Sequence, residues 1–341
     1  MGGDSNSPKI ADVARIAGVS TATVSRVIHD NGFVSEDTRL RVEKAVEQLG
    51  YQTRRAPRQI VSERIVLLLT GDIVNPFFAE VIRGAQDEII LQKCAMNIMQ
   101  LSTDHTKIVR AAAQLPATGV IITGSYPFPE LMEWREEARV PLVVINYRIN
   151  QPGIGCILVD FKDAFARATR HFINLGHTRI GYVDVTGGSE ISVARLNGHK
   201  TALAEANIPF RPELYTAIPA DTHVYGGFQA ASNLLALPVE ERPTAILGFN
   251  DLFALGIMHA VRAHGLRVPD DISVIGCDDV PMAAYAYPPL TTVSLPKYRI
   301  GKLAVSTLLQ MCNEAPDPLG TYTLMESPLI IRESTAPCSK G

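Results

Sequence analysis

The chain of 341 residues is poor in residues that build covalent or metal cross-links. Its eight histidines form no metal-type pair, since His259 and His264 stand five positions apart. Its cysteines are odd in number and widely spaced: Cys94, Cys156, Cys277, Cys312 and Cys338. We therefore expect reduced thiols, with no disulfide, no metal site and no cofactor.

Long apolar runs are also missing from the sequence. No stretch approaches the ~20 apolar residues that a membrane-spanning helix requires. The N-terminal MGGDSNSPK has no apolar segment of the signal-peptide kind, and Asn6 departs from the myristoylation pattern. These absences predict a cytoplasmic protein without a membrane partner, whose residues 1–8 form a disordered tail.

Motifs of common enzyme classes are incomplete. The GIG sequence at 153–155 lacks the third glycine of a dinucleotide site, and the GGS sequence at 187–189 lacks the spacing of a nucleophile elbow. The neighbouring Asp278 and Asp279 lie on a segment expected to be extended, where adjacent side chains point apart. The sequence therefore does not indicate an enzyme.

Charge is low overall but unevenly distributed. The formal net charge is −3. Residues 1–60 contain nine Lys and Arg against seven Asp and Glu, whereas the remainder contains 23 against 28. Because an acidic body is a poor surface for nucleic acid, any DNA contact is expected at the N-terminal end.

The segment IADVARIAGVSTATVSRVI, residues 10–28, contains two short helical patterns. We expect a first helix that ends at Gly18 and a second that Ser20 caps. Their apolar faces are Ile10, Val13, Ala14 and Ala17 in the first and Val24, Val27 and Ile28 in the second. Two short helices joined by three residues form a helix-turn-helix.

Four residues of the second helix lie off its apolar face: Thr21, Ala22, Ser25 and Arg26. They occupy the part of a recognition helix that meets base edges in the major groove. The guanidinium of Arg26 can donate two bonds to a guanine, worth roughly 1–3 kcal/mol of discrimination. Arg26 is therefore the leading candidate for reading bases. The alternative is an ordinary helix corner with Arg26 in solvent.

A third helix is predicted from Ser35 to Leu49. Glu36 and Asp37 stand in its first turn, where the helix dipole favours negative charge. Its predicted core face is Leu40, Val42, Ala45, Val46 and Leu49. Three helices in fifty residues can close a small core.

Seven stretches follow one another along nearly the whole chain: KIADVARIAGVSTATVSRVI, VSEDTRLRVEKAVEQLGY, NPFFAEVIRG, GHTRIGY, FNDLFALG, VPDDISVIGCDD and PPLTTV. In this order they resemble the lactose-repressor (LacI/GalR) family of transcription factors. The resemblance implies a DNA-binding domain over residues 9–51. It also implies base contacts by Thr21, Ala22 and Arg26, with phosphates near Thr23, Ser25, His29 and Tyr51.

Residues 52–62, QTRRAPRQIVS, contain no acid and three arginines, Arg54, Arg55 and Arg58. In the family the matching segment is a hinge that becomes helical on operator DNA and inserts a leucine into the minor groove. Ile60 stands at the position of that leucine. Pro57 is a departure, because proline has no N–H to donate within a helix. We expect Pro57 to be the first residue of the hinge helix, where the missing N–H costs little.

From residue 63 onward, short apolar runs alternate with amphipathic helical patterns. Strands are expected near 65–69, 96–101, 120–123, 142–146, 157–159, 179–183, 245–248, 273–277 and 329–331. Strands separated by helices imply parallel sheets with both faces covered. Some ten strands are too many for one comfortable sheet. We therefore predict an α/β body of two doubly wound lobes, similar to the periplasmic sugar-binding-protein fold.

This body, residues 63–341, is the predicted effector-binding and dimerisation domain. The chain is expected to cross between lobes near Asp160, 289–293 and 322–325. Lobe 1 then comprises about 63–160 and 293–322, and lobe 2 about 161–291 and 324–335.

Ligands of such sheets bind beyond the carboxyl ends of the strands, here between the lobes. The residues that follow the strands mix aromatic, amide and carboxylate groups, which suits a molecule rich in hydroxyls. From these positions and the family resemblance, the expected effector site is Phe77, Phe78, Ser125, Asn146, Tyr147, Arg195, Thr222, Asn250 and Asp278. Thr222 stands where many relatives have an aromatic side chain. Phe77 is alternatively a core residue, and Asp251 a helix cap.

The sequence does not identify the effector. The stretches GSYPF, PPLTTV and LIIRES are most similar to cytidine-responsive members of the family, so a nucleoside competes with a sugar or sugar acid. The family implies a two-fold dimer on a pseudo-palindromic operator. The C-terminal PLIIRESTAPCSKG has no heptad repeat, which favours a homodimer over a tetramer.

The sequence thus predicts an effector-controlled transcriptional repressor whose partners are operator DNA, a small-molecule effector and a second copy of the chain. A sugar-binding receptor without DNA and a sugar-processing enzyme are the alternatives. A secreted receptor should carry a signal peptide and no helix-turn-helix, and this chain has the reverse.

Overall fold

The computed structural model describes residues 8–29, 34–49, 64–101, 104–124, 127–313 and 320–339. The chain divides into two compact units, Met1–Val61 and Ser62–Gly341. Each unit has a hydrophobic core of its own. Tyr51 and the hinge residues Arg54, Arg55, Pro57, Arg58 and Ile60, which the sequence predictions include, lie outside the described residues.

The first unit contains the three predicted helices, α1 (Ile10–Ala17), α2 (Thr21–His29) and α3 (Glu36–Leu49). Gly18 closes α1 with a left-handed φ of 65°, which glycine adopts without steric penalty. Ser20 caps α2 as predicted, because its Oγ accepts a hydrogen bond from the backbone N–H of Thr23 at 3.1 Å. The buried core is Val13, Ala14, Ala17, Val24, Val27, Val42 and Ala45.

One predicted core residue of α3 is wrong. Leu40 has 53% of its surface exposed, whereas Val42 and Ala45 are buried and Val46 and Leu49 pack against them. Residues two positions apart on an α-helix point in nearly opposite directions, because each residue turns the helix by about 100°. Leu40 therefore cannot share a face with Val42.

The second unit has two six-stranded sheets. The first has the order β11-β5-β4-β3-β1-β2, and all its pairs are parallel. The second has the order β12-β10-β9-β8-β6-β7, and only β12 is antiparallel to its neighbour. We call the half of the unit built on the first sheet lobe 1 and the half built on the second sheet lobe 2. The predicted two-lobed architecture is confirmed.

The strands of lobe 1 are β1 (Ile65–Thr70), β2 (Ala95–Gln100), β3 (Gly119–Ile122), β4 (Leu142–Ile145), β5 (Ile154–Val159) and β11 (Thr321–Met325). The strands of lobe 2 are β6 (Ile180–Val185), β7 (Tyr215–Ile218), β8 (Ala245–Gly248), β9 (Ser273–Asp278), β10 (Thr291–Ser294) and β12 (Leu329–Ile330). The nine strands expected from the sequence are present, and β7, β10 and β11 were not foreseen.

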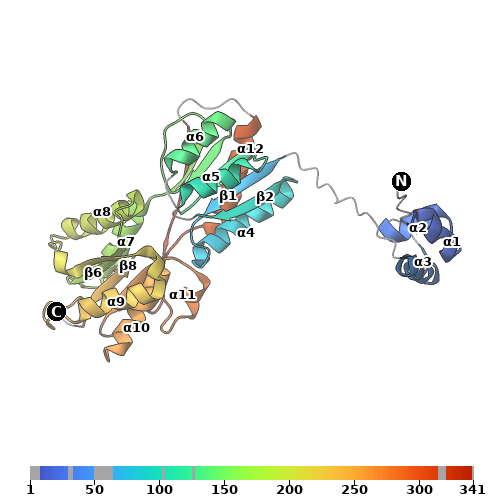
Figure 1. The fold of residues 1–341 in the computed structure, drawn as a ribbon. Helices are drawn as coiled ribbons and strands as arrows, with labels where there is room; N and C mark the ends of the chain where they lie inside the picture. Colours follow the sequence, from blue (N-terminus) through green and yellow to red (C-terminus); the bar gives the residue numbers. More distant parts are fainter. Residues whose placement is uncertain are drawn as a thin grey trace. The chain divides into compact units, whose positions relative to one another are not determined.

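Helices cover both faces of each sheet (Figure 1). Those of lobe 1 are α4 (Pro76–Leu91), α5 (His105–Ala113), α6 (Pro129–Ala138) and α12 (Lys297–Asn313). Those of lobe 2 are α7 (Phe161–Asn174), α8 (Glu190–Glu205), α9 (His223–Leu235), α10 (Asp251–Ala263) and α11 (Pro281–Tyr285), with short 3-10 turns η1 (Pro212–Leu214) and η2 (Ala220–Thr222). Within the described ranges, none of the helices has the length and apolar character needed to cross a bilayer.

The strand β1 shows why its sequence is apolar throughout. Val66 and Leu68 belong to the core under α4 and α12, whereas Leu67 and Leu69 belong to the core under α5 and α6. All four side chains have no exposed surface. Successive residues of a strand point to opposite faces, so a sheet covered on both sides needs apolar residues without alternation.

Within the described ranges the chain crosses between the lobes three times. The first crossing is at Asp160, as predicted, where the aspartate caps α7 by accepting from the N–H of Asp163 at 2.9 Å. The other two lie at 295–296, between β10 and α12, and at 326–328, between β11 and β12. The predicted crossings at 289–293 and 322–325 are wrong, because most of those residues form β10 and β11. Both strands are rich in threonine, which is polar but β-branched and suits a strand.

Close helix contacts at glycines hold the layers of both lobes. A Cβ added to Gly84 of α4 would lie 1.9 Å from the backbone oxygen of Tyr298 in α12, and one added to Gly301 would lie 2.0 Å from that of Val81. Gly198 makes the same kind of contact between α8 and α7, and Gly227 and Gly256 make it between α9 and α10. We call these three contacts the glycine crossings.

Replacing Gly84 by alanine is expected to lower the free energy of unfolding. Helix propensity alone would make alanine stabilising by about 1 kcal/mol. The clash with the Tyr298 backbone forces α4 and α12 apart, and overpacking of this kind costs typically ~1–3 kcal/mol. Urea unfolding of the full chain measures the change, with the exposed Gln86→Ala on the same helix as control. A Gly84→Ala variant more stable than wild type would show that the two helices separate freely.

Candidate functional site

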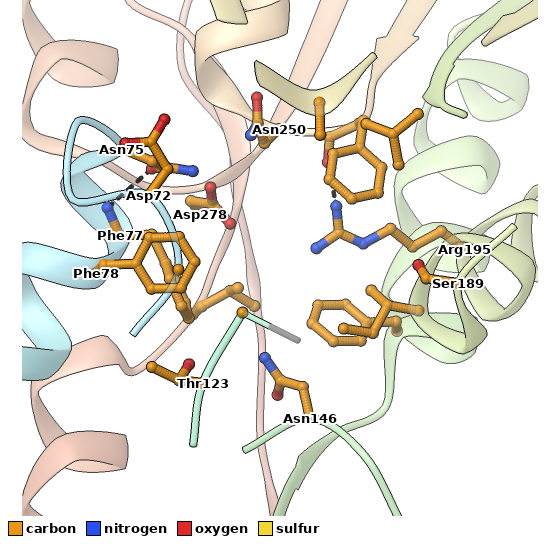
Figure 2. Close-up of a pocket in the computed structure, with 18 of the residues that line it drawn as sticks. Asp72, Asn75, Phe77, Phe78, Thr123, Asn146, Ser189, Arg195, Asn250 and Asp278 are labelled. Atoms are coloured by element: carbon orange, nitrogen blue, oxygen red, sulfur yellow. Dashed lines mark hydrogen bonds between the residues drawn. The ribbon is translucent and has the colours of Figure 1, made fainter. Parts of the chain in front are cut away.

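A cleft of about 410 Å³ lies at the carboxyl ends of the strands, between the two lobes. Lobe 1 contributes Gly71, Asp72, Asn75, Phe77, Phe78, Thr123, Gly124, Asn146 and Tyr147 to its wall. Lobe 2 contributes Phe161, Val185, Thr186, Ser189, Ile191, Arg195, Ala220, Asp221, His223, Phe249, Asn250 and Asp278, and Leu295 belongs to the second crossing. Polar groups and aromatic rings therefore meet around one space from both lobes (Figure 2).

Arg195 of α8 is the buried cation of this cleft, with only 4% of its surface exposed. Three aromatic rings surround its guanidinium, with centroids at 4.0 Å (Phe249), 4.4 Å (Phe161) and 5.1 Å (Phe165) from Cζ. Nη1 donates to the carbonyl oxygen of Phe249. Nε has no hydrogen-bond partner within the described part of the chain. A buried donor without a partner costs free energy. This N–H can therefore donate a hydrogen bond to an acceptor that enters the cleft.

Asp278 faces Arg195 from the end of β9 (Figure 2). Its φ of 115° lies in a region that L-residues rarely adopt, and such strain is concentrated at functional sites. Burial raises the pKa of the Asp278 carboxyl to about 6, although Arg195 and Lys297 oppose the shift. Lys297 Nζ holds this corner by donating to the carbonyl oxygens of Asp278, Asp279 at 2.8 Å and Leu295 at 3.3 Å.

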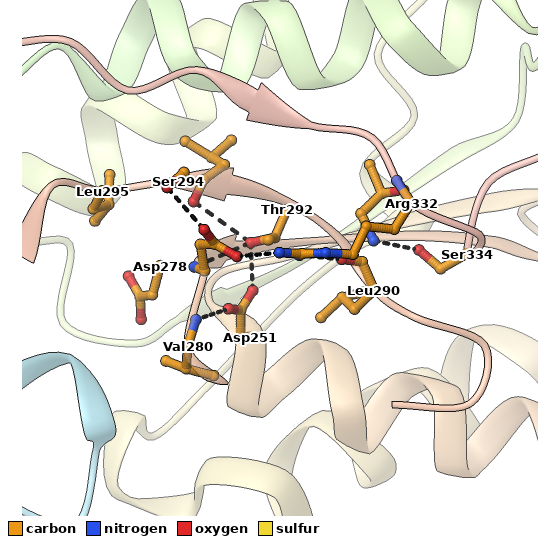
Figure 3. Close-up of polar contacts among 12 residues, drawn as sticks. Asp251, Asp278, Val280, Leu290, Thr292, Ser294, Leu295, Arg332 and Ser334 are labelled. Carbon is orange, nitrogen blue, oxygen red and sulfur yellow. Dashed lines mark hydrogen bonds and ion pairs between the residues drawn. The ribbon is translucent and has the colours of Figure 1, made fainter. Parts of the chain in front are cut away.

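Two other aspartates of lobe 2, Asp251 and Asp279, do not line the cleft. Figure 3 shows Asp251 bonded to Val280 and Thr292. Asp279 accepts from Arg332 Nη2 at 2.7 Å and from Ser294 Oγ at 2.9 Å. Asp251 has no exposed surface and accepts from the Val280 N–H at 2.7 Å and from Thr292 Oγ1 at 2.5 Å. Burial raises the pKa of Asp251 well above its usual value. Asp278 and Asp279 thus diverge, as expected from their adjacent positions.

Unsatisfied polar atoms concentrate in the cleft. Seven buried side-chain nitrogen or oxygen atoms of the described residues have no hydrogen-bond partner. Four of them belong to cleft residues: Thr123 Oγ1, Asn146 Oδ1, Arg195 Nε and His223 Nδ1. Buried polar groups in folded proteins are nearly always paired. Their grouping here points to a polar molecule that completes the hydrogen bonds.

The structure brings most of the predicted effector residues together. Phe77, Phe78, Asn146, Tyr147, Arg195, Asn250 and Asp278 all line the cleft. Ser125 lies outside the described residues. Asn250, and not Asp251, caps α10, because its Oδ1 accepts from the Phe253 N–H at 3.0 Å.

Thr222 does not line the cleft. Its Oγ1 donates to the carbonyl oxygen of Pro219 at 2.5 Å within η2, which turns the side chain to its own backbone. The next residue, His223, lines the cleft instead. Sequence reasoning missed His223 and also Asp72, because no motif contains either residue.

The second candidate interface is the exposed face of α2. Thr21, Ala22 and Arg26 are exposed there, and Ser25 is half-buried. Arg26 makes no hydrogen bond or ion pair with another described residue, so its guanidinium is available to an outside partner. The Thr23 hydroxyl is 2.8 Å from Ser20 Oγ at the helix start. The side chain of His29 lies outside the described part of the structure.

Among the residues that the structure describes, no group of three or more His, Cys, Asp or Glu side chains is arranged to hold a metal ion.

Comparison with known proteins matches both units of the chain. Residues 9–54 match the family described as bacterial regulatory proteins, lacI family, and residues 169–335 match the periplasmic binding protein-like domain. The HTH-type transcriptional repressor PurR of Aliivibrio fischeri is 34% identical over 88% of this chain and 90% of its own length. PurR of Photobacterium profundum is 34% identical over 95% of this chain and 98% of its own.

Solved structures agree over nearly the same span. A transcriptional regulator CelR–cellobiose complex superposes with a TM-score of 0.71 at 26% identity, covering 96% of this chain and 99% of that one. The lac repressor dimer bound to operator and the anti-inducer ONPF gives a TM-score of 0.68 at 25% identity over the same shares.

Proposed function

Because the chain belongs to the lacI family of bacterial transcriptional regulators, we propose that the cleft between its lobes is the effector site of a DNA-binding repressor. The observation that carries the assignment is that four buried polar atoms in one cleft have no partner among the described residues. A ligand that bridges two lobes can change their arrangement only through its different affinity for each arrangement. Control of operator binding by an effector follows from that difference.

The α2 face supplies the DNA contact in this proposal. Thr21, Ala22 and Arg26 read base edges, while Thr23, Ser25, His29, Tyr51 and the hinge residues Arg54, Arg55, Arg58 and Ile60 contact the backbone or the minor groove. The exposure of Arg26 supports its role. The dimer of the lac repressor on its operator supports two-fold binding to a pseudo-palindromic site. We accordingly place the protein in the cytoplasm and assign it a regulatory role without catalysis.

The charges of the cleft favour an uncharged effector. Asp72, Asp221 and Asp278 line it against one guanidinium, that of Arg195. His223 is the only other nitrogen base among the described lining residues. A carboxylate would enter a space that already has an excess of negative charge, and like charges are costly in a desolvated site. We therefore place neutral sugars and nucleosides ahead of sugar acids.

Thermal unfolding of the full chain with neutral sugars, sugar acids and nucleosides tests this assignment. A ligand that binds only the folded protein at about 100 times its Kd stabilises it by ~2.7 kcal/mol. We expect a rise in Tm with at least one neutral compound. Stabilisation by sugar acids alone would contradict the preference for an uncharged effector. If no sugar, sugar acid or nucleoside raised Tm, the cleft would not be a site for these compounds.

The fragment 62–341 is expected to stay folded, dimeric and able to bind effector without binding DNA. Its two sheets and their cores are complete without the first unit, whereas the basic N-terminal segment is gone. Sedimentation and a gel-shift assay measure the two properties. A monomer at micromolar concentration would contradict the dimer part, and operator binding by the fragment would contradict the DNA assignment.

A further inference from the structure

His223 and Asp72 join the two lobes across the cleft. His223 is the first residue of α9 in lobe 2, and Asp72 lies between β1 and α4 in lobe 1. Nε2 of His223 donates to Oδ2 of Asp72 at 2.8 Å. Both residues line the cleft, so the pair forms part of its wall.

Asp72 is fixed in place for this contact. Its Oδ1 accepts from the backbone N–H of Val74 at 3.0 Å, which leaves Oδ2 for the imidazole. The bond from Val74 lowers the pKa of Asp72, burial opposes this, and the His223 contact lowers it further. The carboxylate is therefore ionised at neutral pH and can only accept hydrogen bonds.

His223 is held in an unusual backbone conformation, with φ 46° and ψ −128°. A residue other than glycine is strained in such a region, so the surrounding structure must hold it there. The conformation lets one residue both begin α9 and present its ring to the opposite lobe.

The Asp72 contact determines which ring nitrogen carries the proton. Since a carboxylate cannot donate, Nε2 must carry the hydrogen. In the neutral ring Nδ1 is then a pure acceptor. That atom is buried and has no partner among the described residues. With the ring neutral, the cleft therefore contains an acceptor of fixed direction that no group of the described residues satisfies.

We propose that His223 recognises the effector through Nδ1, which accepts a hydrogen bond from a hydroxyl or amino group of the ligand, and that Asp72 in the other lobe selects the tautomer that allows it. The inference rests on the cleft being the effector site. It makes His223 a specificity-determining residue and Asp72 a positioning residue. Because the two residues come from different lobes, the correct tautomer is enforced only when the lobes are as close as they are here.

Two substitutions separate recognition from the contact between lobes. A glutamine amide N–H can take the place of Nε2–H and keep the bond to Asp72, but it offers no acceptor at Nδ1. An asparagine places an amide oxygen near Nδ1 and does not reach Asp72. The probes are cytidine, adenosine and D-ribose with the full chain, measured by calorimetry.

We expect His223→Gln to weaken the bound probe by roughly tenfold or more, the size of one buried hydrogen bond, and His223→Asn to weaken it less. An analogue of the bound probe that lacks the hydroxyl or amino group bonded to Nδ1 should bind wild type more weakly than the probe does. His223→Gln should bind the analogue and the probe with the same affinity. Ligand-free thermal unfolding of both variants checks that they fold. Equal affinity of His223→Gln and wild type would overturn the inference and leave the effector site standing. A wild type that binds neither these probes nor any other neutral compound of the thermal screen would contradict both.

The tautomer is tested without ligand. Nitrogen NMR of the full chain labelled at histidine, at alkaline pH, should show His223 protonated at Nε2, with its signals assigned by their loss in His223→Gln. Asp72→Ala should lower the population of this tautomer and let the form protonated at Nδ1 appear. Asp221→Ala is the matched control, because it removes another cleft carboxylate that does not bond to His223. A ring protonated at Nδ1 in wild type would refute the role of Asp72.

Discussion

Replacing Arg195 by alanine is expected to abolish the effector response while leaving operator affinity largely intact. The guanidinium is buried among three rings and uses only part of its donor capacity within the protein. Removal of a charged partner from a closed site costs about 2–5 kcal/mol of binding free energy. At roughly 1.4 kcal/mol per tenfold, this corresponds to a Kd increase of some thirtyfold to several thousandfold.

Calorimetry with the bound neutral ligand and a gel shift with operator measure the two effects. Arg211→Ala is a suitable control, because it removes an exposed guanidinium from the same lobe. Asp278→Ala should behave as Arg195→Ala does, since its carboxylate faces the same space. Wild-type ligand affinity in both variants would show that the site assignment is wrong.

Replacing Arg26 by alanine should remove sequence discrimination while retaining salt-dependent, nonspecific DNA binding. A bidentate contact to a guanine is worth about 1–3 kcal/mol per half-site, and a dimer has two half-sites. The phosphate contacts, which give the salt dependence, come from other residues.

The measurement is competition between an operator selected from random-sequence DNA by the wild-type chain and a scrambled duplex, at several salt concentrations. Lys44→Ala is the control, because it removes an exposed positive charge from α3 and not from α2. Its effect should be equal on both duplexes. If Arg26→Ala kept the wild-type ratio between operator and scrambled DNA, the base-reading role would be refuted.

Helices and buried strands were predictable because their signals are local. The turn at Gly18 and the cap at Ser20 are written in neighbouring residues, and the apolar run of β1 predicts a strand covered on both faces. The strands β10 and β11 were missed because their threonines reduce the apolar signal. Leu40 was misplaced because it stands two residues before Val42, about 200° away around the helix, so the two cannot both face the core.

The cleft was partly predictable for a different reason. Residues at the carboxyl ends of parallel strands meet at one edge, so Asn146, Asn250 and Asp278 could be assigned together. Asp72 and His223 could not, because they are 151 positions apart and meet only when the lobes face each other. The shift from Thr222 to His223 depends on one local bond, Thr222 Oγ1 to Pro219 O, that has no sequence motif.

The glycine crossings determine how the helices of each lobe pack, whereas other residues determine which ligand binds. Gly84, Gly198 and Gly227 set helix spacing through backbone contact, and none of them lines the cleft. The cleft side chains come largely from strand ends and loops, where exchange leaves that spacing unchanged. New ligand preferences can therefore evolve through a few substitutions on an unaltered scaffold, which also makes this body a starting point for engineered sensors of unrelated small molecules.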